Sequence, residues 1–444
     1  MRMWTLRLRW SDPEPNDPTV PVDWRHAALI IATLFLNFSF CMNYGLVLSS
    51  FGSLPVVAVV LGAGALLLMA LFFIGPAMAA QAAQRRVFGL IEDSFGSIPA
   101  LVLRVCAVVF LALWIAGLVA VPMLWALARV PERETSLFKT ILIAIGILVF
   151  LFATGLQNIR TSARLALFTN KLCISILIAA FIRVHDGWAA IPAGFPTAGQ
   201  PPTVEQLCYG LSRLAFYVAP LALLAADVAS RSAGRRQVAF TGLTGMALPV
   251  FGALILSVGI GVATSVSRLY RPSLNPTVVM ALFSGVAGSA MPSRMFVAAV
   301  TTFGAVRFGA RALLDSASVR PFRRSRWVLL GCLVAAIAWL SMYPYSEGLT
   351  RASDLAATCL VIAGAVLTAD FLRGWRHGEK VRRFDWVGVA ALLAGLAVPL
   401  CLRGRYNHWF PSPMPSYGVG FLACLCGRAV QKVPVTSGFK KAPE

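Results

Sequence analysis

Long apolar runs, separated by short polar or Pro/Gly-rich stretches, dominate the whole chain. A transmembrane helix needs about 20 largely apolar residues, and twelve such runs can be read along the 444 residues. Their centres lie near residues 39, 67, 112, 146, 175, 218, 251, 290, 336, 361, 393 and 423. The pattern therefore predicts an all-α integral membrane protein with about 12 transmembrane helices.

The composition supports this prediction and excludes one class of partner. Only 13% of the residues are charged, and Lys and Arg outnumber Asp and Glu by 39 to 18, a net charge of +21. In a soluble protein such an excess would indicate a nucleic-acid partner, but here the basic residues stand in short clusters between apolar runs. We therefore expect membrane lipids around the protein, no nucleic acid and no obligate protein partner.

The basic residues also predict the orientation. With alternate loops assigned to opposite sides, 26 of the 39 basic residues fall on one side and 8 on the other, and Arg307, Arg311 and Arg428 belong to the richer side. Because cytosolic loops are enriched in Lys and Arg, we place that side, which carries both termini, in the cytosol. The sequence thus predicts a multi-pass protein of the cell inner membrane.

Patterns of catalysis or metal binding are lacking. The nine cysteines have no paired spacing, and the four histidines fall at the ends of apolar runs or in loops. An enzyme buried in the membrane needs a cluster of such groups at one depth. We therefore predict no enzyme, no catalytic residues, no metal and no organic cofactor.

Two runs carry the features of discontinuous helices. The sixth run, LSRLAFYVAPLALLAAD, contains Pro220, and the first, LFLNFSFCMNYGLVLSSFG, contains Asn37, Asn43, Tyr44 and Gly45. Secondary transporters commonly build their substrate site from two broken helices at equivalent places in inverted repeats. Five spans separate the two runs, so we expect inverted five-helix repeats with breaks in spans 1 and 6. The alternative is that these residues serve packing or a kink.

Ionisable residues inside the bilayer cost about 2.5 to 3.5 kcal/mol each on insertion scales, so they are functional candidates. Lys171 lies in the fifth run and Arg294 late in the eighth. Snorkelling toward the membrane surface is the alternative for both. Asp227 ends the sixth run shortly before Arg231, and we interpret this pair as a salt bridge or gate.

Three aromatic residues lie where a substrate could contact them. Trp114 stands near the middle of the third run, away from the interfacial belts, and Phe216 and Tyr217 stand beside Pro220. Two aromatic faces can clamp a planar ring. The alternative for Trp114 is packing or contact with lipid.

Three stretches resemble one transporter family: EDSFGSIPALVLRVCAVVFLALWIAG, LALLAADVASRSAGRR and VLTADFLRGWRHGEKVRRFDWVGVAALLAG. On these stretches, and in span count and loop lengths, the chain is similar to distant members of the nucleobase cation symporter family. This family comprises the purine, cytosine, uracil, allantoin and hydantoin permeases. The resemblance implies the leucine-transporter-like fold of the amino-acid/polyamine/organocation superfamily.

The resemblance also implies roles for individual residues. Trp114 would stack on the base, and Phe216 and Tyr217 would approach its opposite face. The unwound middle of span 1, around Phe40 to Tyr44 and including Asn43, would supply carbonyl oxygens to the substrate and to a cation.

The eighth run departs from the family pattern. The family offers neighbouring Ser or Thr residues to sodium there, whereas this run has no adjacent Ser or Thr pair at the expected place, and its candidates are the separated Ser289 and Ser293. Some members of the superfamily replace sodium with a basic side chain from helix 5 or helix 8. The resemblance thus suggests Lys171 or Arg294 as a substitute for the cation, and it leaves coupling to H⁺ or Na⁺ open.

We therefore predict a permease for a small planar nitrogen heterocycle such as a nucleobase, working by alternating access. The alternatives are an amino-acid or amine transporter of the same fold and, less favoured, a membrane enzyme on lipid-linked substrates using Glu92/Asp93 or Glu132/Glu134.

We divide the chain into a disordered cytosolic tail (1–25), a first repeat (26–184), an inverted second repeat (207–372), two additional helices (384–430) and a cytosolic tail (431–444).

Overall fold

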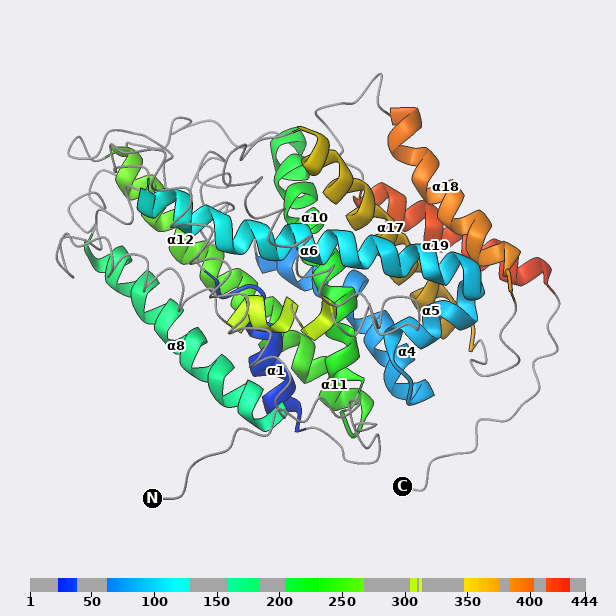
Figure 1. Ribbon diagram of the computed structural model, residues 1–444, viewed down its shortest axis with the longest axis horizontal. Coiled ribbons are helices and arrows are strands. Elements are labelled where there is room, and N and C mark those ends of the chain that lie inside the picture. Colours follow the sequence, from blue (N-terminus) through cyan, green and yellow to red (C-terminus); the bar gives the residue numbers. More distant parts are fainter. Residues whose placement is uncertain are drawn as a thin grey trace, which may run out of the picture.

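The computed structural model describes residues 23–37, 62–127, 159–183, 204–230, 232–266, 304–309, 311–313, 347–374, 383–402 and 413–431. Every regular element in these ranges is a helix, so the predicted all-α class is confirmed (Figure 1). Their bounds are α1 Trp24–Ala32, η1 Met69–Ile74, α4 Gly75–Ala83, α5 Val87–Phe95, α6 Ser97–Leu127, α8 Ile159–Arg183, α10 Val204–Ala229, α11 Arg235–Gly242, η3 Leu243–Ala247, α12 Leu248–Val266, α17 Glu347–Leu372, α18 Trp386–Leu402 and α19 Pro413–Val430.

The predicted spans agree with these helices wherever both can be compared. Five helical stretches of the described chain are long and apolar enough to cross a membrane: 62–83, 97–118, 162–179, 235–257 and 351–372. Eight of the twelve predicted centres lie within helices of the structure. The centres near 39, 146, 290 and 336 lie outside the described residues.

The helix of the first span ends before the predicted centre of that span, near residue 39. Helix α1 stops at Ala32, and residues 33–37 form turns and bends. The carbonyls of the last helical turn, which have no partner inside the helix, accept hydrogen bonds from elsewhere. Those of Ile31 and Ala32 accept N–H groups of residues 34–36, and that of Ile30 accepts the Thr33 hydroxyl at 2.7 Å. The unwinding expected at Phe40 to Tyr44 lies outside the described residues.

The expected break in span 6 is wrong, because α10 runs unbroken through Pro220. Proline cannot donate to the carbonyl of Phe216, four residues earlier. Membrane helices tolerate this loss when neighbouring helices hold the backbone in place. Pro220 is buried, as are Ala219 and Leu221 on either side of it, so packing keeps the helix on its course.

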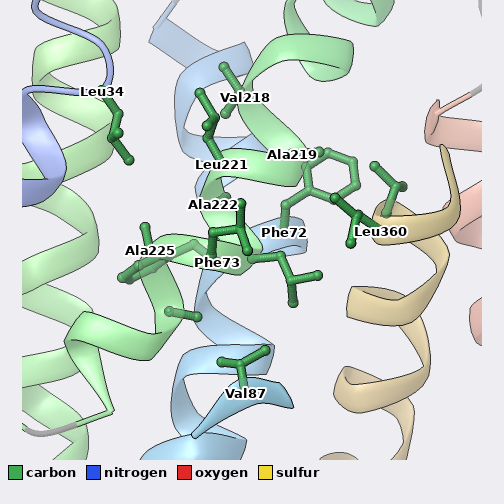
Figure 2. Close-up of a cluster of buried hydrophobic side chains, with 14 of the residues drawn as sticks. Leu34, Phe72, Phe73, Val87, Val218, Ala219, Leu221, Ala222, Ala225 and Leu360 are labelled. Atoms are coloured by element: carbon green, nitrogen blue, oxygen red, sulfur yellow. The ribbon is translucent and has the colours of Figure 1, made fainter. Parts of the chain in front are cut away.

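The core at this point depends on small side chains. Ala219, Ala222 and Ala225 of α10 are buried beside Phe72 and Phe73 of the π-helical segment η1 (Figure 2). Small residues let membrane helices approach closely. This packing places the middle of α10, with the residues just before Pro220, at the centre of the molecule (Figure 1).

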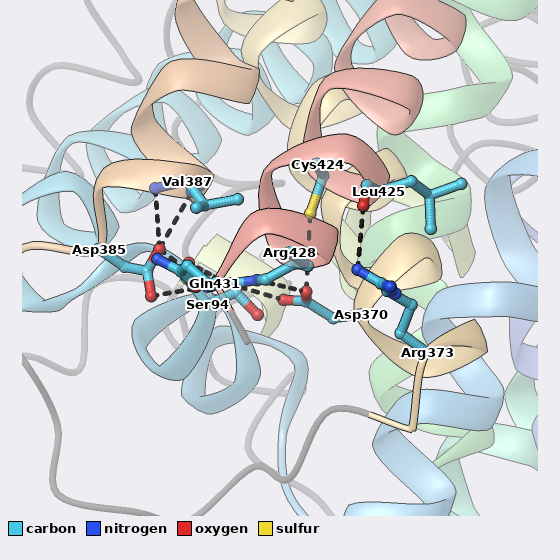
Figure 3. A network of polar contacts seen from close by, with 10 residues as sticks. Ser94, Asp370, Arg373, Asp385, Val387, Cys424, Leu425, Arg428 and Gln431 are labelled. Atoms are coloured by element: carbon cyan, nitrogen blue, oxygen red, sulfur yellow. Dashed lines mark hydrogen bonds and ion pairs between the residues drawn. The ribbon is translucent and has the colours of Figure 1, made fainter. Parts of the chain in front are cut away.

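One buried arginine joins the last helices to the rest (Figure 3). Arg428 of α19 forms ion pairs with Asp370 of α17 at 2.9 Å and with Asp385, just before α18, at 2.8 Å. It also donates to the carbonyl oxygen of Ser94 in α5 at 3.1 Å. The charge count assigned Arg428 to the cytosolic side, and the structure adds that two carboxylates compensate its charge inside the protein.

Candidate functional site

Trp114 of α6 and Tyr217 of α10 meet inside the helix bundle. Their ring centroids are 6.2 Å apart and their planes lie at 64°, an edge-to-face contact. A ring clamped between parallel faces needs those faces about 7 Å apart, because each contact takes about 3.5 Å. In this structure the two aromatic rings contact each other, so a ligand can enter between them only when one ring turns. Phe216, the third predicted aromatic, is half-buried against the core.

Asn37 links the end of span 1 to this aromatic pair. Its side chain is fully buried and donates from Nδ2 to the Leu34 carbonyl at 2.7 Å and to the Tyr217 hydroxyl at 3.4 Å. Spans 1 and 6 therefore meet at Tyr217. The other polar candidates of span 1 lie outside the described residues: Asn43, Tyr44 and Gly45.

Trp114 is enclosed but keeps one polar group without a partner. It is 8% exposed, and a Cβ added at Gly309 would lie 2.8 Å from its Cζ3 atom, so the indole rests against a backbone without a side chain. Its Nε1–H donates to no group in the described chain. A buried donor without a partner costs about 1–3 kcal/mol. This N–H can be satisfied by an acceptor on a ligand.

A polar seam joins α1 to α8. Asn170 of α8 is buried and donates from Nδ2 to the Leu29 carbonyl of α1 at 3.0 Å, while its Oδ1 accepts from no described group. Thr33 and Thr169 lie on either side of Gly304, where a Cβ would come within 2.8 Å of both side chains. The seam therefore brings an amide oxygen without a partner and two hydroxyl groups close to the carboxyl end of α1.

Lys171, next to Asn170 on α8, has an exposed side chain. It contributes neither to the seam nor to the cavity described below. Its role as a substitute for the cation stays a prediction. The other residues proposed for that role lie outside the described residues: Ser289, Ser293 and Arg294.

Asp227, at the carboxyl end of α10, is half-buried and accepts the backbone N–H of Val87 at 3.0 Å. Val87 is the first residue of α5, whose initial N–H groups have no partner inside the helix. Asp227 thus joins α10 to α5. Its expected partner, Arg231, lies outside the described residues, so the salt bridge or gate stays a prediction.

Beside Asp227, a cavity of about 90 Å³ lies between α1, α5, α8, α10 and the helical residues 304–308 and 311–312. We call it the Arg307 cavity. Its lining includes polar and charged side chains: Thr33, Ser162, Asp227, Arg307 and Arg311. Arg307 is 5% exposed and donates from Nη2 to the Ser162 hydroxyl at 2.9 Å, while its Nε–H has no partner in the described chain. The charge count assigned Arg307 to a cytosolic loop, whereas the structure places it in a helical segment with its side chain buried.

The carboxylates considered for an enzyme are held by arginines. Asp93 pairs with Arg85, and Glu92 lies 3.6 Å from Arg104. All four residues belong to α5, α6 or the turn before α5, so Glu92 and Asp93 are not loop charges. Glu132 and Glu134 lie outside the described residues. Within the described ranges, no group of three or more His, Cys, Asp or Glu side chains could hold a metal ion.

Sequence reasoning missed three residues of these sites. Asn170 directly precedes the predicted Lys171, and only its burial distinguishes the two. Gly309 and Arg307 belong to GAVRFGARALL, in which Arg307 and Arg311 lie four residues apart among small residues. The small residues around these arginines are typical of a closely packed helix, whereas the charges alone were interpreted as a loop signal.

No family model matches the chain, and no curated protein matches it either. Solved structures do. Mhp1, a nucleobase-cation-symport-1 family transporter in a closed conformation with bromovinylhydantoin bound, has a TM-score of 0.64 at 15% identity over 92% of both chains. An outward-open Na⁺-coupled sialic acid symporter has a TM-score of 0.59 at 13% identity, over 93% of this chain and 90% of that one.

A manganese transporter of Eremococcus coleocola is similar to a lesser degree. Its TM-score is 0.54 at 13% identity, over 93% of this chain and 97% of that one. At these identities the likeness concerns the fold. The chain is a helical, multi-pass membrane protein, and over more than nine-tenths of its length it has the fold of these transporters.

Proposed function

We propose that the protein is a secondary active transporter that moves a small planar nitrogen heterocycle, such as a nucleobase, across the inner membrane. Its termini would lie in the cytosol. The observation that carries the proposal is the buried Nε1–H of Trp114, which has no partner in the described chain and lies beside Tyr217. An aromatic face and a buried donor together suit a flat ring that carries acceptor atoms.

The position of this pair fits alternating access. Tyr217 lies on α10 where the polar end of span 1, through Asn37, reaches it. A ligand whose ring displaces Tyr217 from Trp114 would also break or change the hydrogen bond between Tyr217 and Asn37. Ligand binding would thereby be coupled to the relative positions of spans 1 and 6, which is how such transporters expose their site to one side at a time.

The fold adds support of a coarser kind. Mhp1, in the structure similar to this one, holds a substituted hydantoin, which is a planar nitrogen ring. The sialic acid symporter is coupled to Na⁺. The hydantoin bound to Mhp1 supports the proposed class of ligand, and the Na⁺-coupled symporter supports coupling to a cation.

Coupling to H⁺ or Na⁺ would act at the seam between α1 and α8. Asn170 would be the residue that senses the ion, because its Oδ1 accepts from no described group and its Nδ2 donates to the end of α1. Uptake measured with a sodium or a proton gradient would identify the ion. We expect Asn170→Ala to lower gradient-driven uptake at least tenfold and Lys171→Ala, at an exposed position, to lower it less than twofold. A larger loss of uptake in Lys171→Ala than in Asn170→Ala would favour Lys171 as the residue that replaces the cation.

An amino-acid or amine transporter of the same fold is the alternative function. It would hold a carboxylate at the helix end in span 1, and Trp114 would be a packing residue. A thermal-shift screen of the purified protein separates the two, because a ligand that binds only the folded state raises the midpoint of unfolding. Nucleobases, hydantoins and amino acids would be compared at equal concentrations.

We expect stabilisation by nucleobases or hydantoins, loss of that stabilisation in Trp114→Ala, and its retention in Trp386→Ala. Trp386 is a matched control because its side chain is 73% exposed. Stabilisation by amino acids alone would support the alternative. Stabilisation by heterocycles that persists in Trp114→Ala would remove Trp114 from the site.

A further inference from the structure

We propose that the Arg307 cavity is a binding site for an oxyanion, namely a carboxylate or phosphate group, and that Arg307 is its principal ligand. Neither Trp114 nor Tyr217 lines this cavity, and the proposed function assigns it no ligand, so the inference goes beyond that function. The argument rests on the burial of Arg307, on its hydrogen bonds and on the charges around the cavity.

Arg307 is a buried charge without a counter-ion in the described chain. Buried charged side chains are normally paired, because transfer of an unpaired ion out of water is strongly unfavourable. Arg307 is 5% exposed, and its one hydrogen bond in the described chain runs to the neutral hydroxyl of Ser162. Its Nε–H donates to nothing in the described chain. An anion in the cavity would supply both the missing charge and the missing acceptor.

The carboxylate that lines the same cavity does not serve as this counter-ion. Oδ1 of Asp227 accepts the N–H of Val87 at 3.0 Å, and Asp227 forms no ion pair with Arg307 in the described chain. Arg311 lines the cavity as well. The guanidinium groups of Arg307 and Arg311 therefore line a common space, and an anion in that space would lie beside two cationic side chains.

The geometry of the guanidinium points to an oxyanion in particular. Arginine offers planar, fixed N–H donors that match the two oxygens of a carboxylate or phosphate. The bond from Nη2 to Ser162 fixes the plane of the group and leaves Nε–H for a ligand. Phe88, Leu165 and Phe308 supply apolar walls, which strengthen a charge-assisted hydrogen bond by excluding water.

The oxyanion can come from two sources, a free anion such as phosphate or the carboxylate of a transported heterocycle. Calorimetric titration of the purified full chain would use four probes at constant ionic strength in chloride. Formate and phosphate represent the free anion. Orotate, a pyrimidine carboxylate, and uracil, the same ring without the carboxylate, test an anion carried by a substrate.

We expect saturable binding of at least one oxyanion probe and a rise in its Kd of tenfold or more in Arg307→Gln, which corresponds to about 1.4 kcal/mol. Arg307→Lys keeps the charge but lacks the planar fork, so it should weaken binding severalfold; this variant serves if Arg307→Gln fails to fold. The matched control is Arg164→Gln, which removes a positive charge at an exposed position of the same helix as Ser162. It should change Kd less than twofold.

The four probes distinguish the two sources of the oxyanion, and the Arg307 variants test whether this cavity is the binding site. Binding of formate or phosphate indicates a free anion, and orotate binding tighter than uracil by a margin that Arg307→Gln removes indicates a substrate carboxylate. Absence of saturable oxyanion binding, or equal binding by wild type, Arg307→Gln and Arg307→Lys, would overturn the proposal. The variant Trp114→Ala, which tests the proposed function, should leave formate and phosphate binding unchanged.

Discussion

The chemistry of the candidate site depends on a few single contacts. Trp114 touches Tyr217 on one side and lies against Gly309 on another, so the position of its indole is set by an aromatic edge and by a missing side chain. Glycine at 309 is therefore a steric requirement. A methyl group there would occupy space that the indole now fills.

Gly309→Ala should impair ligand binding while the fold is retained. Its Cβ would lie 2.8 Å from Trp114 and 2.9 Å from Ile115, distances that require the indole to shift. We expect Kd for a heterocycle to rise at least tenfold in a binding assay. Gly418→Ala is the matched control, because a Cβ at Gly418 has nothing within 4 Å. Equal affinity of both variants would show that the indole position is not critical.

At the scale of elements, close helix contacts and one buried ion cluster hold the bundle together. Helix α4 approaches α17 at Gly75, where a Cβ would lie 2.3 Å from the Thr368 hydroxyl oxygen. Helix α19 is joined to α17 and α18 through Arg428 (Figure 3). These two features support the frame in which α6 and α10 present their aromatic residues.

Gly75→Ala should destabilise the contact between α4 and α17. Overpacking of a filled interior typically costs about 1–3 kcal/mol. Thermal or denaturant unfolding in detergent measures the loss, and Gly252→Ala in α12, with no atom within 4 Å of its Cβ, is the control. Thr368→Ala in the Gly75→Ala background removes the hydroxyl and methyl groups but keeps a Cβ 2.8 Å away, so it should recover part of the loss. Failure of this rescue would mean that the clash lies elsewhere.

Arg428→Met should destabilise the protein by about 3–5 kcal/mol, because it leaves Asp370 and Asp385 buried without their cation. Replacing both aspartates with Asn in the same variant should restore part of this free energy of unfolding. Arg373→Met is the control: Arg373 is exposed and donates to the Leu425 carbonyl at 3.1 Å. Similar losses from Arg428→Met and Arg373→Met would contradict the assignment of the cluster.

Predictions from sequence succeeded for the positions of the helices, which follow from the pattern and length of the apolar runs. The helices around Trp114, Tyr217 and the C-terminal spans follow from apolar runs long enough to span a bilayer. Spans 1 and 6 were singled out from their polar residues and Pro220, and the structure joins them through the contact of Asn37 with Tyr217.

Other outcomes depend on tertiary contacts that a single sequence does not display. Pro220 predicted a break in the helix, but α10 is continuous through it because the residues around Pro220 are packed in the core. Arg307 and Arg428 were counted as loop charges, because a charge count does not distinguish a solvated arginine from one that is buried. Asn170 and Lys171 are adjacent polar residues, and the sequence does not show that the first side chain is buried and the second exposed.

At the scale of the whole molecule, the orientation in the membrane can be tested on α17. Arg351 and Arg373 are exposed at opposite ends of this helix. In a background without the exposed Cys401 and Cys426, we expect Arg351→Cys in intact cells to react with a membrane-impermeant thiol reagent. Arg373→Cys should react only after permeabilisation. The opposite pattern would invert the topology.

Uptake of a labelled nucleobase or hydantoin into proteoliposomes tests the central claim most directly. The account predicts saturable uptake that is competed by other heterocycles but not by amino acids, that is lost in Trp114→Ala and that persists in Trp386→Ala. Uptake no greater than in protein-free liposomes for every heterocycle, or equal uptake by the Trp114→Ala variant, would contradict it.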